Sequence, residues 1–250
     1  MDQPNIKILI LGHNGMLGHV VDRYLQQNKF NIVKTNLRWP SNEFISFIKN
    51  CECDYLINCI GSIPQKNTLS EEFYSNNFLL PVFLSNNFNG YIIHPSSDCE
   101  NYDCDLDNYA YSKLIAYNHL KLFDNIFIIK SSIIGPELKN KKSLWEWLLN
   151  NNDNNIMGFS NHFWCGITTL EWAKIALLII DKQINRNLIE ASTNIISKYS
   201  LLKILNKKLN LKKSIIKCAH KDYINRYVKS SLSIKNIENQ INEMIIWYKK

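Results

Sequence analysis

The chain of 250 residues lacks any long hydrophobic run. Its longest apolar run, from Ile175 to Ile180, is far shorter than the roughly 20 residues that a membrane-spanning helix needs. The segment before Ile6 lacks the basic residues of a signal peptide. These absences predict a cytoplasmic protein without a membrane segment.

Cysteines are present, but not in the patterns that bind metals. The chain has seven, and an odd number in a cytoplasmic protein indicates reduced thiols. One residue separates Cys51 from Cys53, which matches neither a redox CxxC motif nor half of a zinc site. We therefore expect no bound metal.

The net charge of +7 arises partly from lysines that crowd between Lys198 and Lys221. Leu201, Leu205 and Leu209 lie among these lysines with the spacing of one buried helix face. This pattern favours a solvated helix over a nucleic-acid interface, so no nucleic-acid partner is expected. The positive charge also suits an anionic nucleotide substrate.

Glycine is scarce, yet three of the eight glycines stand at three-residue spacing near the N-terminus. They follow an apolar strand pattern from Ile6 to Leu11 and precede a helical pattern that continues to about Asn28. In a dinucleotide site, such glycines allow a sharp turn, a close approach of backbone N–H groups to a pyrophosphate, and tight packing of helix on strand. The alternative is a strand–turn–helix without a ligand. The predicted cofactor-binding residues here are Gly12, His13, Asn14, Gly15, Met16, Leu17 and Gly18.

Strand and helix patterns alternate along the first half of the chain, which predicts an α/β fold with a Rossmann-type parallel sheet flanked by helices. We expect an NADP-binding domain over residues 1–134 and mainly a small substrate-binding lobe over 135–250, with some elements returning to the sheet. The expected strands are 6–11, 30–35, 55–60, 91–94, 126–131 and 188–191. The expected helices are 41–49, 73–86 with an interruption near Pro81, 109–122, 143–149, 169–181, 200–210 and 237–248.

Parallel strands place their carboxyl ends at one edge of a sheet. This edge would carry further cofactor-binding residues, namely Cys59, Ile60, Gly61 and Ser132, together with Ser97. The second strand ends without the acidic residue that usually binds the adenine ribose, and Arg38 follows shortly after. An arginine there favours the 2′-phosphate of NADPH over NADH, unless Arg38 is an ordinary surface residue.

Tyr109 and Lys113 form a YxxxK element on a predicted helix, where i and i+4 share one face. An ammonium beside a tyrosine lowers the pKa of its hydroxyl, and the same lysine can bind the nicotinamide ribose. Ser97 would hydrogen-bond the reacting carbonyl oxygen. Tyr109 and Lys113 are therefore predicted to be catalytic and cofactor-binding, and Ser97 to be catalytic. The alternative is that Tyr109 and Lys113 are two surface residues of a helix.

Together these motifs resemble the extended short-chain dehydrogenase/reductase superfamily, and within it the dTDP-4-dehydrorhamnose reductase branch. The resemblance spans most of the chain. Its segments are Gly12-x-x-Gly15-x-x-Gly18, Leu56-Ile57-Asn58-Cys59, Asn77-x-x-x-Pro81, Ser96-Ser97-Asp98-Cys99, Tyr109-x-x-x-Lys113, Ile129 to Glu137, and Trp164 to Glu171.

The resemblance implies NADPH-dependent reduction of the 4-keto group of a nucleotide-linked 4-keto-6-deoxyhexose, as in nucleotide-rhamnose synthesis. Tyr109 would protonate the alkoxide and Lys113 would assist it. The substrate-binding residues would be Ser97, Asp98, Asn77 and Trp164. The segment between Ser97 and Tyr109 is shorter than in the rhamnose reductases, so the identity of the substrate stays open, both its sugar and the choice between UDP and dTDP. The sequence also leaves a homodimeric state open.

Cys99 distinguishes this chain from similar enzymes. Sugar-nucleotide 4,6-dehydratases carry Asp-Glu here, whereas Asp98 is followed by Cys99, which argues against a dehydratase. Bifunctional 3,5-epimerase/4-reductases that make UDP-rhamnose carry a cysteine at this position, so Cys99 is a candidate catalytic residue for epimerisation. The alternative is a buried small side chain. A non-catalytic NADP-binding regulatory subunit and a nucleotide-sugar 4-epimerase are the competing functions.

Overall fold

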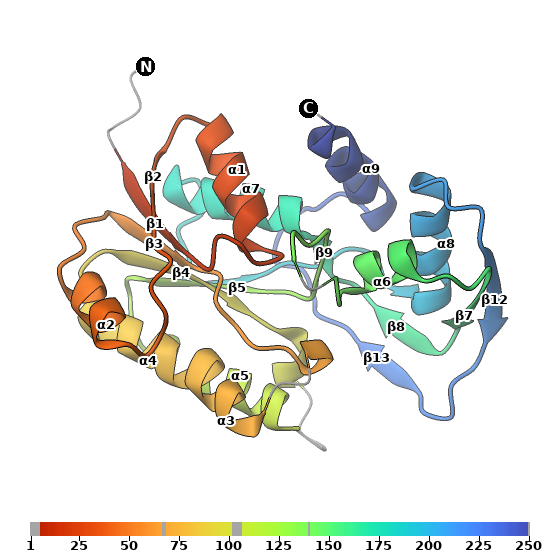
Figure 1. The fold of residues 1–250 in the computed structure, drawn as a ribbon, viewed down its shortest axis with the longest axis horizontal. Coiled ribbons are helices and arrows are strands. Elements are labelled where there is room, and N and C mark those ends of the chain that lie inside the picture. Colours follow the sequence, from red (N-terminus) through yellow and green to blue (C-terminus); the bar gives the residue numbers. More distant parts are fainter. Residues whose placement is uncertain (1–5, 67–68, 102–106, 140, 250) are drawn as a thin grey trace.

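The computed structural model describes residues 6–66, 69–101, 107–139 and 141–249. Its centre is a six-stranded sheet in the order β10-β5-β4-β3-β1-β2, and every pairing in it is parallel (Figure 1). The strands are β1 (Lys7–Leu11), β2 (Asn31–Lys34), β3 (Tyr55–Asn58), β4 (Tyr91–Ser96), β5 (Ile126–Lys130) and β10 (Leu188–Glu190). This sheet confirms the predicted fold class.

Strand order reverses beside β1, which pairs with β2 on one side and β3 on the other. The connections from β1 and β3 therefore leave in opposite directions at their carboxyl ends. Open parallel sheets bind ligands in the crevice at such a switch point. The glycine loop after β1 and the segment after β3 border this crevice.

Successive side chains along a strand point to opposite faces of the sheet, and both faces are apolar, so helices cover both. Ile8 and Ile10 belong to one buried cluster, and Leu9 and Leu11 belong to another. The first face packs against α1 (Gly18–Gln27) and α7 (Thr169–Ile180), and the second against α2 (Asn42–Lys49), α4 (Leu80–Asn87) and α5 (Asn108–Leu120) (Figure 1).

The helix predicted over residues 73–86 consists of three consecutive pieces. It begins earlier, with α3 (Ser70–Tyr74), continues through a π-helical turn (Ser75–Leu79), and ends as α4. Pro81 has no N–H to donate to the carbonyl of Asn77, so the regular hydrogen-bond ladder cannot pass through this point. A π turn is one way for a helix to accommodate such a break. Asn77 lies in this π turn, and its side chain is buried.

The C-terminal half supplies β10 to the main sheet and builds a smaller lobe beside it (Figure 1). The strands of this lobe are each two to five residues long, and we did not predict them because such short segments give little periodic pattern. They are β6 (Ile133–Ile134), β7 (Asn155–Phe159), β8 (His162–Trp164), β9 (Ile167–Thr168), β11 (Ile196–Ser197), β12 (Ser214–Cys218) and β13 (Ile224–Arg226). The lobe's helices are α6 (Leu144–Asn150), α8 (Lys198–Lys208) and α9 (Ile237–Tyr248). Throughout the described ranges, no helix is long and apolar enough to cross a membrane.

Candidate active site

The glycine loop between β1 and α1 is too tightly packed for larger residues at two of its three glycines. Gly12 has φ +73°, and a Cβ atom there would lie 2.9 Å from the carbonyl carbon of Cys59. A Cβ on Gly18 would lie 2.2 Å from the carbonyl oxygen of Gly12. Gly15 closes the turn by donating its N–H to that same carbonyl at 2.9 Å. The first and third glycines thus meet the steric demands expected of a dinucleotide-binding loop.

The N-terminus of α1 is suited to an anion. Its N-cap residue, Leu17, makes no side-chain cap, and its first turn contains no acidic residue. The helix dipole therefore favours negative charge at this point. His13, Asn14 and Met16 are at least partly exposed around the loop, whereas Leu17 is buried and offers only its backbone. These residues fit the pyrophosphate of a dinucleotide.

The last helix, α9, stabilises the glycine loop through His19. The Nδ1 atom of His19 hydrogen-bonds the carbonyl of Gly15 at 2.7 Å, and its Nε2 atom hydrogen-bonds the hydroxyl of Tyr248 in α9. Burial lowers the pKa of His19. A neutral imidazole with its proton on Nδ1 would donate to Gly15 and accept from Tyr248. Sequence reasoning missed this contact, which joins residues at opposite ends of the chain.

Arg38 is exposed beyond the carboxyl end of β2. Its carbonyl accepts the N–H of Ser41, whose hydroxyl in turn caps α2 by accepting the N–H of Phe44. The backbone of Arg38 is therefore fixed, and the residue is exposed at the carboxyl edge of the sheet, which also carries the glycine loop.

The segment after β3 is held in place by Asn77. The Asn77 amide accepts the N–H of Ser62 at 2.9 Å, and it donates to the Ser62 carbonyl at 3.1 Å and to the Ser112 hydroxyl at 3.2 Å. Asn77 is only 1% exposed, and these hydrogen bonds give it a positioning role for the segment after β3. Its contact with the substrate stays a prediction. Gly61 is exposed next to Asn77, and Cys59 and Ile60 are half-buried.

After β4, the side chains of Ser97, Asp98 and Cys99 form one chain of hydrogen bonds. The Cys99 thiol donates to the Ser97 hydroxyl at 3.1 Å, and that hydroxyl donates to the Asp98 carboxylate at 3.2 Å. Burial raises the pKa of Asp98, although nearby Arg226 opposes the shift. The other carboxylate oxygen of Asp98 is buried without a hydrogen-bond partner among the described residues.

A buried ion pair behind this segment was not predicted. Glu100 and Lys130 lie 3.4 Å apart, with side chains 1% and 6% exposed. Glu100 also accepts the Ser96 hydroxyl at 2.6 Å and the Ser97 N–H at 3.0 Å. Lys130 at the end of an apolar strand was the available sign, because a buried lysine requires a partner. The pair fixes the backbone that carries Ser97.

Tyr109 and Lys113 lie on the first turns of α5, which Asp107 caps through the N–H of Ala110 at 2.7 Å. The Ser97 hydroxyl lies close enough to Tyr109 to influence the pKa of its hydroxyl, so the predicted serine and tyrosine do meet. The Lys113 ammonium donates to the carbonyl of Pro95 at 3.4 Å. A Cβ on Gly61 would lie 3.8 Å from that ammonium nitrogen, so Lys113 reaches the segment after β3.

Burial raises the pKa of Tyr109, and the nearby Ser97 hydroxyl opposes this shift only in part. This is the reverse of the lowered pKa that we predicted from Lys113. The ammonium does not overcome the loss of water around the hydroxyl, and burial also lowers the pKa of Lys113 itself. Tyr109 therefore holds its proton at neutral pH.

Trp164 links the smaller lobe to the end of β5. Its indole N–H donates to the hydroxyl of Ser132 at 2.8 Å, and its side chain is buried. A Cβ on Gly166 would lie 2.2 Å from the carbonyl oxygen of Ser132, so the two chain segments touch. This contact places Ser132, a predicted cofactor residue, and Trp164, a predicted substrate residue, side by side. In the described portion of the chain, no three His, Cys, Asp or Glu side chains are grouped so as to hold a metal ion.

Comparison with known proteins gives a clear result for the fold alone. No protein-family model and no curated protein matches the sequence. A dTDP-4-dehydrorhamnose reductase from Clostridium acetobutylicum superposes with a TM-score of 0.78 at 16% identity, over 98% of this chain and 100% of that one. A dTDP-4-dehydrorhamnose reductase from Bacillus anthracis in complex with NADP gives 0.81 at 13%, with the same coverage.

UDP-glucose 4-epimerase from Thermotoga maritima gives a TM-score of 0.70 at 13% identity, over 98% of this chain and 100% of that one. The chain shares one fold with all three over its full length. Enzymes of different activity are among these similar structures, so the fold leaves the reaction to be argued from the site.

Proposed function

We propose that this protein is an NADPH-dependent reductase of the dTDP-4-dehydrorhamnose reductase type, acting on the 4-keto group of a nucleotide-linked 4-keto-6-deoxyhexose. The observation that carries the proposal is the meeting of Ser97, Tyr109 and Lys113 at the sheet edge that also holds the glycine loop. A cofactor-binding subunit without activity would not need this set. The NADP complex of a protein with the same fold also supports this cofactor.

NADPH, when bound, supplies the hydride that reduces the sugar carbonyl. Tyr109 donates its proton to the carbonyl oxygen as charge develops there, and its raised pKa keeps that proton available at neutral pH. Ser97 hydrogen-bonds the same oxygen and orients it. Lys113 provides positive charge beside the segment after β3, where the nicotinamide ribose would lie.

Epimerisation at C3 and C5 is a second proposed activity, and it rests on Cys99. Its thiol lies 3.1 Å from the Ser97 hydroxyl, within reach of a sugar held there. Burial raises its pKa to about 11, so Cys99 is a better proton donor than proton acceptor at neutral pH. Removal of a sugar proton then requires a second group, and we assign this role to buried Asp98, which accepts a hydrogen bond from the same Ser97 hydroxyl.

The test is NADPH oxidation by the purified protein with UDP- or dTDP-4-keto-6-deoxyglucose. We expect oxidation with at least one substrate, and a fall in kcat of about 10²- to 10⁴-fold in Tyr109→Phe. Tyr111→Phe is the matched control, since Tyr111 lies two residues on in α5 and is 46% exposed. Its kcat should stay at the wild-type value.

Two results would contradict the proposal. Absence of NADPH oxidation with either substrate, while NADPH still binds, would favour a regulatory subunit. Equal activity of Tyr109→Phe and Tyr111→Phe would remove Tyr109 as the proton donor. Epimerisation is followed separately by uptake of solvent deuterium at C3 and C5, which should be lost in Cys99→Ser if the thiol takes part.

A further inference from the structure

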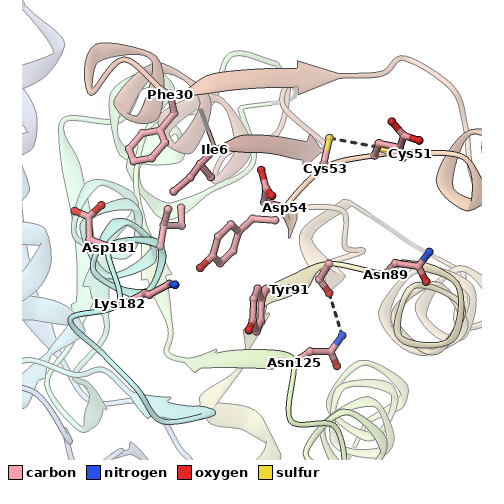
Figure 2. A pocket seen from close by; sticks show the side chains of 14 residues that line it. Ile6, Phe30, Cys51, Cys53, Asp54, Asn89, Tyr91, Asn125, Asp181 and Lys182 are labelled. Atoms are coloured by element: carbon pink, nitrogen blue, oxygen red, sulfur yellow. Dashed lines mark hydrogen bonds between the residues drawn. The ribbon is translucent and has the colours of Figure 1, made fainter. Parts of the chain in front are cut away.

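A cavity of about 1180 Å³ opens at the edge of the main sheet opposite the candidate active site (Figure 2). It lies at the amino ends of β1, β3 and β4. Ile6, Tyr55 and Tyr91 line it, and the rings of the two tyrosines stack with centroids 5.4 Å apart. Nothing in the proposed reduction uses this part of the molecule.

Two thiols form part of the wall of this cavity. The sulfur atoms of Cys51 and Cys53 lie 3.4 Å apart, and both residues are half-exposed (Figure 2). The fold imposes this proximity by fixing both ends of the segment. Cys51 donates its N–H to the carbonyl of Ile48 at the end of α2, and Asp54 donates its own to Lys7 at the start of β1 at 2.9 Å.

The backbone of Cys53 also packs closely against Gly90. A Cβ on Gly90 would lie 2.7 Å from the carbonyl oxygen of Cys53 and 2.5 Å from that of Asp54. These contacts restrict movement of the backbone between Cys51 and Cys53, so the two sulfur atoms stay near each other. They need to move only from 3.4 Å to the roughly 2.0 Å of a disulfide bond.

We propose that Cys51 and Cys53 form a reversible redox site, in which a low-molecular-weight disulfide oxidises the two thiols to an intramolecular disulfide. One thiolate attacks the small disulfide, forms a mixed disulfide and releases one small thiol. The second thiolate then attacks the sulfur bound to the protein, closes the Cys51–Cys53 bond and releases the other small thiol. The two protein thiols lose two protons and two electrons, and the small disulfide is reduced to two thiols.

Either thiol can attack first, because both cysteines line the cavity. The cavity beside the pair accommodates the small group of the mixed disulfide. Once that group is attached to one sulfur, the other sulfur, 3.4 Å away, is close enough to displace it.

The experiment treats the full-length protein with bis(2-hydroxyethyl) disulfide, alkylates the remaining thiols, and maps them by mass spectrometry. Cleavage at Lys49 and Lys66 releases a peptide that contains this pair and Cys59. We expect that peptide to lose two hydrogens, with the bond between Cys51 and Cys53 and the alkyl group on Cys59. Dithiothreitol should restore both thiols.

Matched variants test whether proximity is the cause. Cys218→Ser removes another half-exposed cysteine and should react as the wild type does. Cys51→Ser and Cys53→Ser should form no internal disulfide, and each is checked for folding by circular dichroism. The proposal is overturned if the wild-type protein carries stable 2-hydroxyethylthio groups, as mixed disulfides, on both Cys51 and Cys53, or if both become alkylated after treatment.

Discussion

Substitution of two glycines by alanine separates the packing of the loop after β1 from its binding of a ligand. In Gly18→Ala, the new methyl group would lie 2.2 Å from the oxygen and 2.8 Å from the carbon of the Gly12 carbonyl. Both are backbone atoms, so α1 or the loop has to shift by about 1 Å. In Gly15→Ala, the nearest atom is the same oxygen at 3.3 Å, and a small adjustment suffices.

The energies can be compared. Overpacking costs about 1–3 kcal/mol, whereas replacing a glycine in a helix interior by alanine gains at most about 1 kcal/mol. Gly18 is the first residue of α1, so its gain is smaller still. Gly18→Ala should thus lose about 1–2 kcal/mol, which lowers Tm by roughly 2–8 °C for a chain of this size. Gly15→Ala should change Tm much less.

Gly15→Ala should weaken cofactor binding although it changes stability little, whereas the main effect of Gly18→Ala should be on stability. If a pyrophosphate lies against the backbone at Gly15, the added methyl group removes that approach. Calorimetric titration with NADPH should then show at least a tenfold weaker Kd for Gly15→Ala, at nearly unchanged Tm. Wild-type Tm in Gly18→Ala would refute the packing, and wild-type Kd in Gly15→Ala would refute the binding position.

Two further predictions concern charge. Arg38→Ala should weaken NADPH binding by about 10- to 100-fold and leave NADH binding unchanged, since a hydrogen bond to a charged group contributes about 1.5–3 kcal/mol; equal effects on the two cofactors would show that Arg38 does not contact the 2′-phosphate. Lys130→Met should lower the free energy of unfolding by about 3–5 kcal/mol, measured by urea denaturation, because it leaves Glu100 buried without its cation; an unchanged value would show that the ion pair contributes nothing net.

The parts of the site that could be predicted are those encoded by local sequence. Gly18 and the i, i+4 pair on α5 depend on neighbours a few residues away, and the positive φ of Gly12 belongs to a local turn. The structure places all of them as the spacing indicates. The ion pair between Glu100 and Lys130 depends on two segments that become adjacent only when β4 and β5 pair. No local pattern encodes such a contact.

The short strands of the smaller lobe escaped prediction for a related reason. β8, only three residues long, is defined by its partners β11 and β13 rather than by an alternating pattern of its own. Asn77 illustrates the same limit for a side chain. The resemblance implies a substrate contact for Asn77, but no local pattern predicts that the π turn before Pro81 directs its amide to Ser62 and Ser112.

The raised pKa of Tyr109 affects whether its hydroxyl acts as a proton donor or as a proton acceptor in the proposed reaction. An alkoxide formed from a sugar carbonyl is about as basic as hydroxide, whose conjugate acid, water, has a pKa of roughly 16. A buried tyrosine with a pKa above its usual 10 is still a stronger acid than this, so proton transfer to the sugar remains favourable. Sugar oxidation would instead require Tyr109 as a base, and each unit by which its pKa is raised makes the ionised form about 1.4 kcal/mol harder to reach. Packing of Tyr109 against Phe73, with ring centroids 5.8 Å apart, therefore favours the proton-donor role of its hydroxyl over the proton-acceptor role.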